Sequence, residues 1–407
     1  MPRYYLGVDW GDQQHGVCAR DEHGAIVWEG LVSQTVEGLC EWGRQLDEWR
    51  ASGLTVWAAI EKPEGRVVDF LLDHGVRVYP VNPKALDRAR DRFRLSASKS
   101  DRFDARVLAE FLRTDHPHLA ALEPSSEAAQ ELKLLTRDYA RVVRHQTKLL
   151  NQLTSTLKEY YPRALEVFGD WTTQVARAFL KTYPTPAAVM ALRPAPWRRF
   201  ARAHRLGDAR TTALWDQLTQ PQMPVPEHVV RAKARLVATL IEQLAVTHHG
   251  VETYRAEIDR FFATLPAAEW MQSLPGGKSG TTVPTLWAEL GDAPGRWTSW
   301  HHLQAQAGSV PVTVQSGKSC VVRFRFACNH ALRQAVRWLA FCSLKQSAWA
   351  KAYYQQQRAR GHRHNQALRA LGAKWLKILF MMWKHHVPYD EQYHLANMAR
   401  QHLQASA

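Results

Sequence analysis

The chain has 407 residues, of which 45% are hydrophobic and 22% charged, and its formal net charge at neutral pH is +15. This length predicts two or three domains, and the composition excludes a disordered or fibrous protein. A positive excess of this size indicates a polyanionic partner such as nucleic acid.

Membrane and secreted classes are disfavoured by the sequence. The longest apolar runs, such as 378–383, are too short to cross a bilayer, and no basic segment followed by an apolar one opens the chain. The cysteines are odd in number and form no CxxC pair, which is typical of free thiols in a reducing compartment. We therefore expect a reducing cytoplasmic location and no membrane partner.

The pattern of residues 1–120 predicts an α/β domain. The predicted strands are 4–9, 17–19, 25–31, 54–60 and 76–81, and the predicted helices are 36–49 and 100–112. The second and third strands flank a short turn and should pair as a hairpin. Antiparallel strands followed by strand–helix alternation favour a mixed sheet with helices on its faces.

Residues 121–268 predict a helical arm. A long helix over 123–160 has apolar or uncharged positions three and four residues apart, which form a heptad-like seam. The seam is Leu132, Leu135, Tyr139, Val142, Gln146, Leu149, Leu153 and Leu157. A second long helix covers 227–262, so the arm is either an antiparallel or an intermolecular coiled coil with a small helical insert. Four cations on another face of the first helix are expected to bind nucleic acid: Arg137, Arg141, Arg144 and Lys148.

Residues 269–392 predict a further unit with a serine-containing loop and basic helices, and 393–407 a polar tail that frays. From residue 301 onward fifteen Lys and Arg residues face two acids, with tryptophans and tyrosines between them. Cations interleaved with aromatic rings favour a nucleic-acid surface over a merely solvated face. The expected contacts are Lys318, Arg323, Arg325, Arg333 and Arg337.

Four carboxylates form the first candidate site. Asp9 ends the first strand, Glu61 ends the fourth, and Asp101 and Asp104 lie three residues apart on one face of a helix. Hard divalent cations prefer several oxygen ligands, and phosphoryl-transfer sites use such ions to stabilise attacking and leaving oxygens. Each acid alone would be an ordinary cap or surface charge, whereas the set in this order favours a metal-dependent nuclease site.

Ser316 is the second candidate. It precedes Gly317 in a loop among Lys318, Arg323 and Arg325. A serine that attacks a phosphodiester needs an exposed hydroxyl, a flexible backbone and nearby cations. On composition alone an ordinary turn serine is the better interpretation.

These residues resemble a known family. The stretches 7–11, 60–61 and 99–105 are similar to the DEDD motif of the insertion-sequence transposases called bridge recombinases, a family that includes pilin-gene DNA invertases. Five later stretches are similar, in order, to the family's C-terminal domain: 274–276, 288–292, 307–311, 316–317 and 329–333. The resemblance covers nearly the whole chain except 160–225.

The resemblance implies a RuvC-like domain of RNase H fold at 1–120, a coiled-coil arm at 121–268 and a C-terminal transposase domain at 269–392. It implies that Asp9, Glu61, Asp101 and Asp104 hold magnesium, with manganese as the alternative, and that Ser316 attacks the DNA strand. It also implies donor and target DNA, a structured noncoding guide RNA, and a homo-oligomer that is a dimer or, on nucleic acid, a tetramer. The implied location is the bacterial cytoplasm, close to the nucleoid when the protein is active.

The sequence departs from the family pattern at two places. The turn at 275–280 is altered, and Gln315 stands where the family has a further serine before the nucleophile. Ser319, in the same loop, is therefore the nearest alternative nucleophile, followed by Ser309 and Ser279. The rival functions are a RuvC-like Holliday-junction resolvase that uses metal-activated water, and a catalytically inactive nucleic-acid-binding protein. The C-terminal stretches disfavour the former, and the complete set of acids disfavours the latter.

Overall fold

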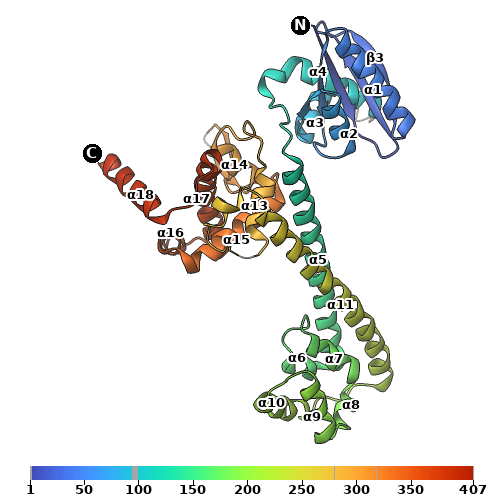
Figure 1. Ribbon diagram of the computed structural model, residues 1–407, viewed down its shortest axis with the longest axis vertical. Coiled ribbons are helices and arrows are strands. Elements are labelled where there is room, and N and C mark those ends of the chain that lie inside the picture. The colour runs from blue at the N-terminus through green and yellow to red at the C-terminus, as the bar shows by residue number, and fades with distance from the viewer. Residues whose placement is uncertain (1, 94–99, 279, 318, 407) are drawn as a thin grey trace. The chain divides into compact units, whose positions relative to one another are not determined.

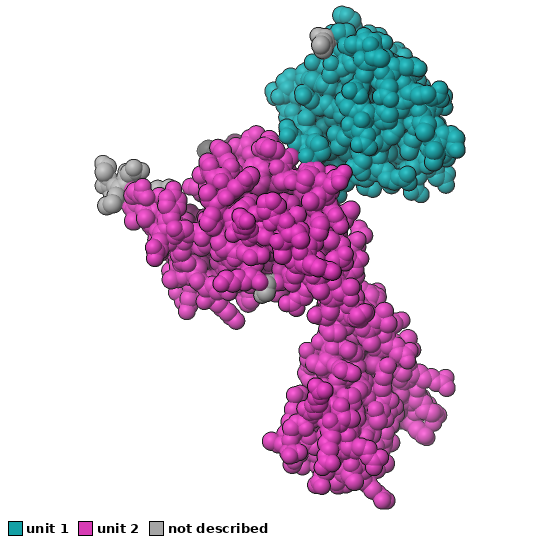
Figure 2. Space-filling view, in the orientation of Figure 1, with its two compact units in different colours: residues 1–124 teal, residues 125–407 magenta. Residues whose placement is uncertain are grey.

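The computed structural model describes residues 2–93, 100–278, 280–317 and 319–406, the last six of these by their backbone alone. They fall into two compact units, residues 1–124 and 125–407 (Figure 2). The predicted Lys318 and Ser279 lie outside the described residues, as does Lys99 beside the predicted DxxD helix.

A five-stranded mixed sheet of order β3-β2-β1-β4-β5 forms the centre of the first unit. Its strands are β1 (Arg3–Asp9), β2 (Gln14–Arg20), β3 (Ile26–Ser33), β4 (Thr55–Ile60) and β5 (Arg77–Pro80). β2 pairs antiparallel with β1 and β3, whereas β4 runs parallel to β1 and β5. The predicted α/β class, hairpin and mixed sheet are therefore confirmed.

Helices cover both faces of this sheet (Figure 1). They are α1 (Val36–Ala51), α2 (Arg66–Asp73), α3 (Pro83–Asp91) and α4 (Asp101–Asp115), followed by the 3-10 turn η1 (His116–His118). The sequence pattern predicts α1 and α4 but neither α2 nor α3. α2 has only eight residues, too few to show a clear period. α3 is started locally, because Asn82 accepts a hydrogen bond from the amide of Lys84 and Pro83 occupies the first turn.

Glycine allows α4 to lie directly on β1. A Cβ added at Gly7 would lie 1.9 Å from the carbonyl oxygen of Ala105, so any side chain there would push the helix away. Strand alternation then divides the core. Tyr5 packs with Leu108 on the α4 side, and Leu6 packs with Leu46 of α1 on the other.

In the second unit α5 (Glu127–Tyr160) and α11 (Glu227–Ala263) form an antiparallel pair within one chain. Gln146 Nε2 lies 3.3 Å from His248 Nδ1, and Lys233 forms an ion pair with Glu159. Of the two arrangements left open by the sequence, the structure thus shows the antiparallel one. The predicted seam is used to pack α11 and the neighbouring helices.

Five short helices connect the far ends of this pair and form a lobe with its own core, here called the distal lobe (residues 161–226; Figure 1). They are α6 (Pro162–Val167), α7 (Gln174–Thr182), α8 (Pro186–Met190), α9 (Pro194–Ala203) and α10 (Asp208–Leu218). Phe179 and Trp197 are fully or almost fully buried in this core, beside Leu153 of α5 and Ile241 of α11.

The rest of the unit is a helical bundle that also packs on the start of α5. Its helices are α12 (Ala268–Met271), α13 (Thr282–Leu290), α14 (Trp300–Gln306), α15 (His330–Gln346), α16 (Ala348–Ala359), α17 (His364–His385) and α18 (Glu391–Ser406). A hairpin of β6 (Val312–Ser316) and β7 (Ser319–Arg323) lies between α14 and α15. Within the described ranges, no helix has the length and apolarity needed to cross a membrane.

The structure differs from two predictions for the C-terminal part of the chain. The tail predicted to fray forms α18, because Asp390 Oδ1 accepts hydrogen bonds from the amides of Gln392 and Tyr393 and starts the helix. Of the aromatic residues expected among the cations, Trp349, Trp375 and Trp383 are buried in the bundle core, whereas Trp338 is exposed. Most of the tryptophans that the sequence predicted to contact nucleic acid are therefore part of the hydrophobic core.

Candidate active site and nucleic-acid surfaces

Two of the four predicted acids lie at the ends of neighbouring parallel strands: Asp9 is the last residue of β1, and Glu61 is the first residue after β4. Val8 of β1 pairs with Ile60 of β4, so the next residues, Asp9 and Glu61, lie side by side at the same edge of the sheet. Gly7 and Ala59 face α4, and strand alternation places Asp9 and Glu61 on that same face. Both side chains are half-buried.

The first turn of α4 lies over this edge of the sheet. Ser100 caps the helix by accepting a hydrogen bond from the amide of Phe103. Gly16, the register partner of Asp9, lies so close to α4 that an added Cβ would stand 2.6 Å from the carbonyl oxygen of Asp101. Asp104 is completely buried in this turn, whereas Asp101 is exposed. The fold thus places the predicted acids at one corner.

An arginine that the sequence analysis did not select joins them. Arg90 of α3 donates from Nε to Asp104 Oδ1 at 2.6 Å and from Nη2 to Asp104 Oδ2 at 2.8 Å. The hydrogen bond to Asp104 raises the pKa of Arg90, and the charge of Glu61 acts in the same direction. A fully buried carboxylate is costly unless its charge is compensated, and the guanidinium supplies that compensation here.

The same end of β2 contains a buried histidine, His15, which precedes Gly16 and therefore faces away from the acids. His15 Nδ1 accepts a hydrogen bond from the amide of Gly11 at 3.3 Å, and Nε2 has no hydrogen-bond partner among the described residues. Burial lowers the pKa of His15, so the neutral ring is favoured. Neither His15 nor Arg90 carries a signal in the sequence, because their importance comes from contacts that the fold creates.

No three His, Cys, Asp or Glu side chains in the described parts of the chain are grouped closely enough to hold a metal ion. The acids share a corner of the fold, and both carboxylate oxygens of Asp104 accept hydrogen bonds from Arg90. The four-carboxylate metal site of the sequence analysis remains a prediction.

Ser316 lies at the tip of an exposed hairpin rather than in an irregular loop. It is the last residue of β6 and pairs with Ser319, the first residue of β7. Gly317 between them has a φ of +54°, a left-handed conformation that glycine adopts without strain. Both serines are exposed. The hydroxyl of Ser316 is accessible as expected, and the hairpin presents Ser319 equally.

The expected nucleic-acid contacts on α5 divide into two groups. Arg141, Arg144 and Lys148 are exposed, and Arg141 also forms an ion pair with Asp138, with Nη1 3.1 Å from Oδ1. Arg137 instead donates to the fully buried Glu289 of α13, from Nε at 2.8 Å and from Nη2 at 3.1 Å. This pair engages Nε and Nη2 of Arg137 and joins α5 to α13.

The cations around the hairpin differ in the same way. Arg323 and Arg337 are exposed, and Arg337 donates to Asn365 Oδ1 at 3.0 Å. Arg333 donates to the carbonyl of Arg325 and lies 4.7 Å from the ring centroid of Phe324. Arg325 and Arg333 therefore support the base of the hairpin, while Arg323 points to solvent from β7.

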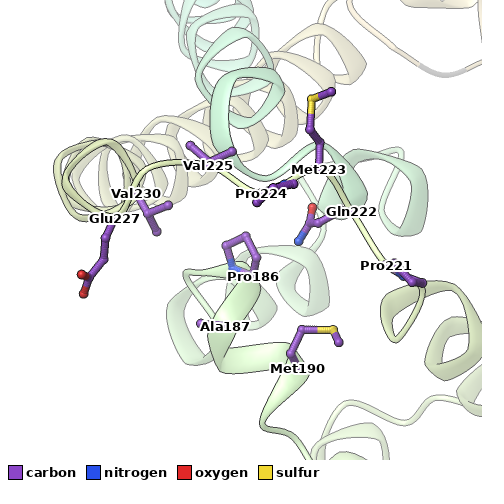
Figure 3. Close-up of a pocket in the computed structure, with 10 residues that line it drawn as sticks. All are labelled: Pro186, Ala187, Met190, Pro221, Gln222, Met223, Pro224, Val225, Glu227 and Val230. Carbon is purple, nitrogen blue, oxygen red and sulfur yellow. The ribbon is translucent and has the colours of Figure 1, made fainter.

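A hollow of about 360 Å³ lies at the edge of the distal lobe (Figure 3). Prolines, Val225, Met190 and Met223 supply most of its lining, and Gln222 and Glu227 are its polar members. Because no set of titratable groups converges there, the hollow lacks the features of a catalytic site.

Comparisons with known proteins agree with the resemblance seen in the sequence. Residues 6–162 match a family model described as a transposase of the DEDD type, and residues 268–355 match a model described as the transposase IS116/IS110/IS902 family. The chain is similar to the mini-circle transposase of IS117 from Streptomyces coelicolor, with 32% identity over 99% of this chain and 98% of the relative.

Two further relatives are aligned over most of their length. A 43.6 kDa protein of insertion element IS110 from Streptomyces coelicolor is 28% identical over 95% of this chain and 96% of its own. A 44.8 kDa protein of IS116 from Streptomyces clavuligerus is 26% identical over 93% and 94%. Neither matched family range includes 163–267, which contains nearly all of the distal lobe.

Proposed function

This chain belongs to the IS116/IS110/IS902 family of transposases, enzymes that cut and rejoin DNA, and from that premise we propose that residues 1–120 are an RNase H/RuvC-like catalytic domain. The observation that carries the proposal is the corner formed by Asp9, Glu61 and the first turn of α4. The five-stranded mixed sheet with α4 across β1 supports it.

Asp9, Glu61, Asp101 and Asp104 would hold a divalent metal ion, magnesium or manganese. Their oxygen donors suit a hard cation, and the burial of Asp104 against Arg90 shows that this corner already requires positive charge. Such an ion, when bound, would stabilise charge that develops on the attacking and leaving oxygens of a phosphodiester. Transposases of the DEDD type typically use divalent metal ions.

Ser316 would be the nucleophile. Its oxygen would bond to phosphorus and displace one DNA oxygen, which leaves as a hydroxyl after taking up a proton. The serine's own proton passes to a nearby base. Because a covalent phosphodiester to serine preserves the bond energy, a DNA hydroxyl can later displace the serine and rejoin the strand. The exposed hairpin tip and Arg323 support this role.

We further propose donor DNA, target DNA and a structured noncoding guide RNA as partners of a homo-oligomer. The exposed cations Arg141, Arg144, Lys148, Arg323 and Arg337 supply charge for phosphate contacts. Because the seam of α5 is occupied by α11 within the chain, subunits would have to associate through other surfaces.

The rival is a junction resolvase in which metal-activated water replaces the serine. The deciding experiment combines the protein with candidate RNA, both DNA partners and magnesium, and assays joined product. Wild type should join strands, and Asp9→Asn should lose cutting and joining by at least about a hundredfold while its circular dichroism is unchanged. If the wild-type protein cuts DNA but forms neither joined product nor a protein–DNA adduct, the resolvase is favoured. Full activity of Asp9→Asn would refute the metal assignment.

A further inference from the structure

The distal lobe carries a concentration of arginine that the proposed chemistry does not use. Six arginines and one acid, Asp208, occur between residues 193 and 210. The arginines are Arg193, Arg198, Arg199, Arg202, Arg205 and Arg210, and all six are exposed. They are called the arginine face below. It lies outside both ranges matched by family models.

The helix beneath this face is firmly held. Trp197, Phe200 and Ala201 form the inner side of α9 and are buried in the core of the lobe. Trp197 Nε1 donates to the carbonyl oxygen of Thr211 at 2.9 Å, which ties α9 to α10. The rings of Trp197 and Phe200 stack with centroids 5.6 Å apart. The outward positions Arg198, Arg199 and Arg202 therefore stand on a fixed support.

The charge of this face is not neutralised by any residue that the structure describes. None of the six guanidinium groups forms a hydrogen bond or ion pair with another described residue, whereas Arg163 and Lys233 near the same lobe are paired with Glu166 and Glu159. Arg202 lies three and four residues after Arg199 and Arg198, a spacing at which like charges repel on a helix. A polyanion would relieve this repulsion.

We propose that the arginine face binds the phosphate backbone of double-stranded DNA. Free guanidinium groups are well suited to phosphate oxygens. The aromatic rings of α9 are turned into the core, so the face offers no aromatic platform of the kind on which proteins that bind single strands stack unpaired bases. DNA is also the polymer on which the family acts. The contact is to backbone and hence independent of sequence.

The test measures binding of the full chain to a duplex of arbitrary sequence in EDTA over a range of salt concentrations. The variant is Arg198→Gln/Arg199→Gln/Arg202→Gln. Loss of three phosphate contacts should weaken binding roughly ten- to a hundredfold near 0.1 M salt and lower the log–log salt slope by about 2 to 3. Arg198→Lys/Arg199→Lys/Arg202→Lys preserves the charge and should stay within a few-fold of wild type.

Arg231→Gln is the matched control, because Arg231 is exposed on α11 but already paired with Glu227, and it should leave binding almost unchanged. A folded RNA at the same phosphate concentration is measured in parallel. Binding by the Gln variant equal to wild type, or a loss that is equal or larger on RNA, would overturn the proposal. The proposal uses the DNA substrate of the proposed function but requires no cutting, so binding in EDTA fails or succeeds independently of the metal and serine assignments.

Discussion

Arg90 is the residue on which the state of the candidate catalytic corner depends. It donates two hydrogen bonds to Asp104, and the negative charge of Glu61 helps to raise its pKa. A metal ion that used Asp104 as a ligand would compete with this guanidinium. The structure therefore suggests that Arg90 compensates the buried carboxylate when no cation is bound.

Replacing Arg90 by Ala should leave Asp104 buried and unpaired. We expect the free energy of unfolding to fall by on the order of 3 kcal/mol in EDTA, because an uncompensated buried charge is costly. Magnesium at millimolar concentration should restore part of the loss, and Arg90→Lys should lose less. Urea unfolding with and without magnesium measures both effects. Stability of Arg90→Ala equal to wild type in EDTA would contradict this interpretation.

Ser316 and Ser319 can be distinguished only by chemistry, because they are cross-strand partners at the same exposed tip. If Ser316 is the nucleophile, wild type and Ser319→Ala should form a covalent protein–DNA adduct and Ser316→Ala should form none. Denaturing electrophoresis of the trapped reaction, followed by peptide mapping, gives the result. An adduct in Ser316→Ala would transfer the role to another residue.

Asp9, Glu61 and Asp104 could be selected from sequence because each follows a local rule, either the end of an apolar strand or a helical spacing. Arg90 could not, since its link to Asp104 spans fourteen residues and depends on how α3 packs beside α4. Arg137 was placed on a cationic face by its spacing alone. Its actual partner, Glu289, is 152 residues away in the sequence.

At the scale of elements, periodicity predicted the long helices and strands well. The apolar seam of α5 predicted a helical partner but could not identify it, because a seam looks the same whether α11 or another chain packs on it. The hairpin of β6 and β7 was interpreted as a loop, since both strands are exposed and show no alternation between buried and exposed positions. Only cross-strand pairing defines it.

The junction of α5, α13 and α15 depends on Glu289, which also accepts a hydrogen bond from Asn329 Nδ2 at 2.6 Å. We expect Glu289→Ala to lower the free energy of unfolding by about 2–3 kcal/mol. This is less than the roughly 3–5 kcal/mol typical of a broken buried pair, because Arg137 can regain water. Chemical denaturation measures this change. Glu131→Ala, an exposed acid on α5, is the control and should change stability by less than about 0.5 kcal/mol. Equal effects of the two variants on stability would show that Glu289 does not stabilise the junction of α5, α13 and α15.

At the scale of the whole molecule, positive charge is concentrated on separate parts of the chain. The residues from 301 onward carry fifteen cations against two acids, and the distal lobe adds the arginine face. Such separated cationic surfaces suit a long polyanion that contacts several parts of the protein at once. The net charge revealed the class of partner from sequence, but only the fold shows which cations are free and which support the core.

Affinity of the whole protein for nucleic acid should therefore fall steeply with salt. Between 50 and 200 mM monovalent salt we expect a loss of at least about a thousandfold, because six or more phosphate contacts release their counterions on binding. Fluorescence anisotropy with a labelled duplex measures it, and sucrose at matched osmolality serves as the control that leaves charge screening unchanged. A change smaller than about tenfold would mean that no more than about two phosphates are neutralised. In that case most of the exposed arginines and lysines would serve solubility. Recognition of DNA would then have to rest on uncharged contacts, such as those of Phe326, which follows the hairpin, and Trp338 of α15, both of which are exposed.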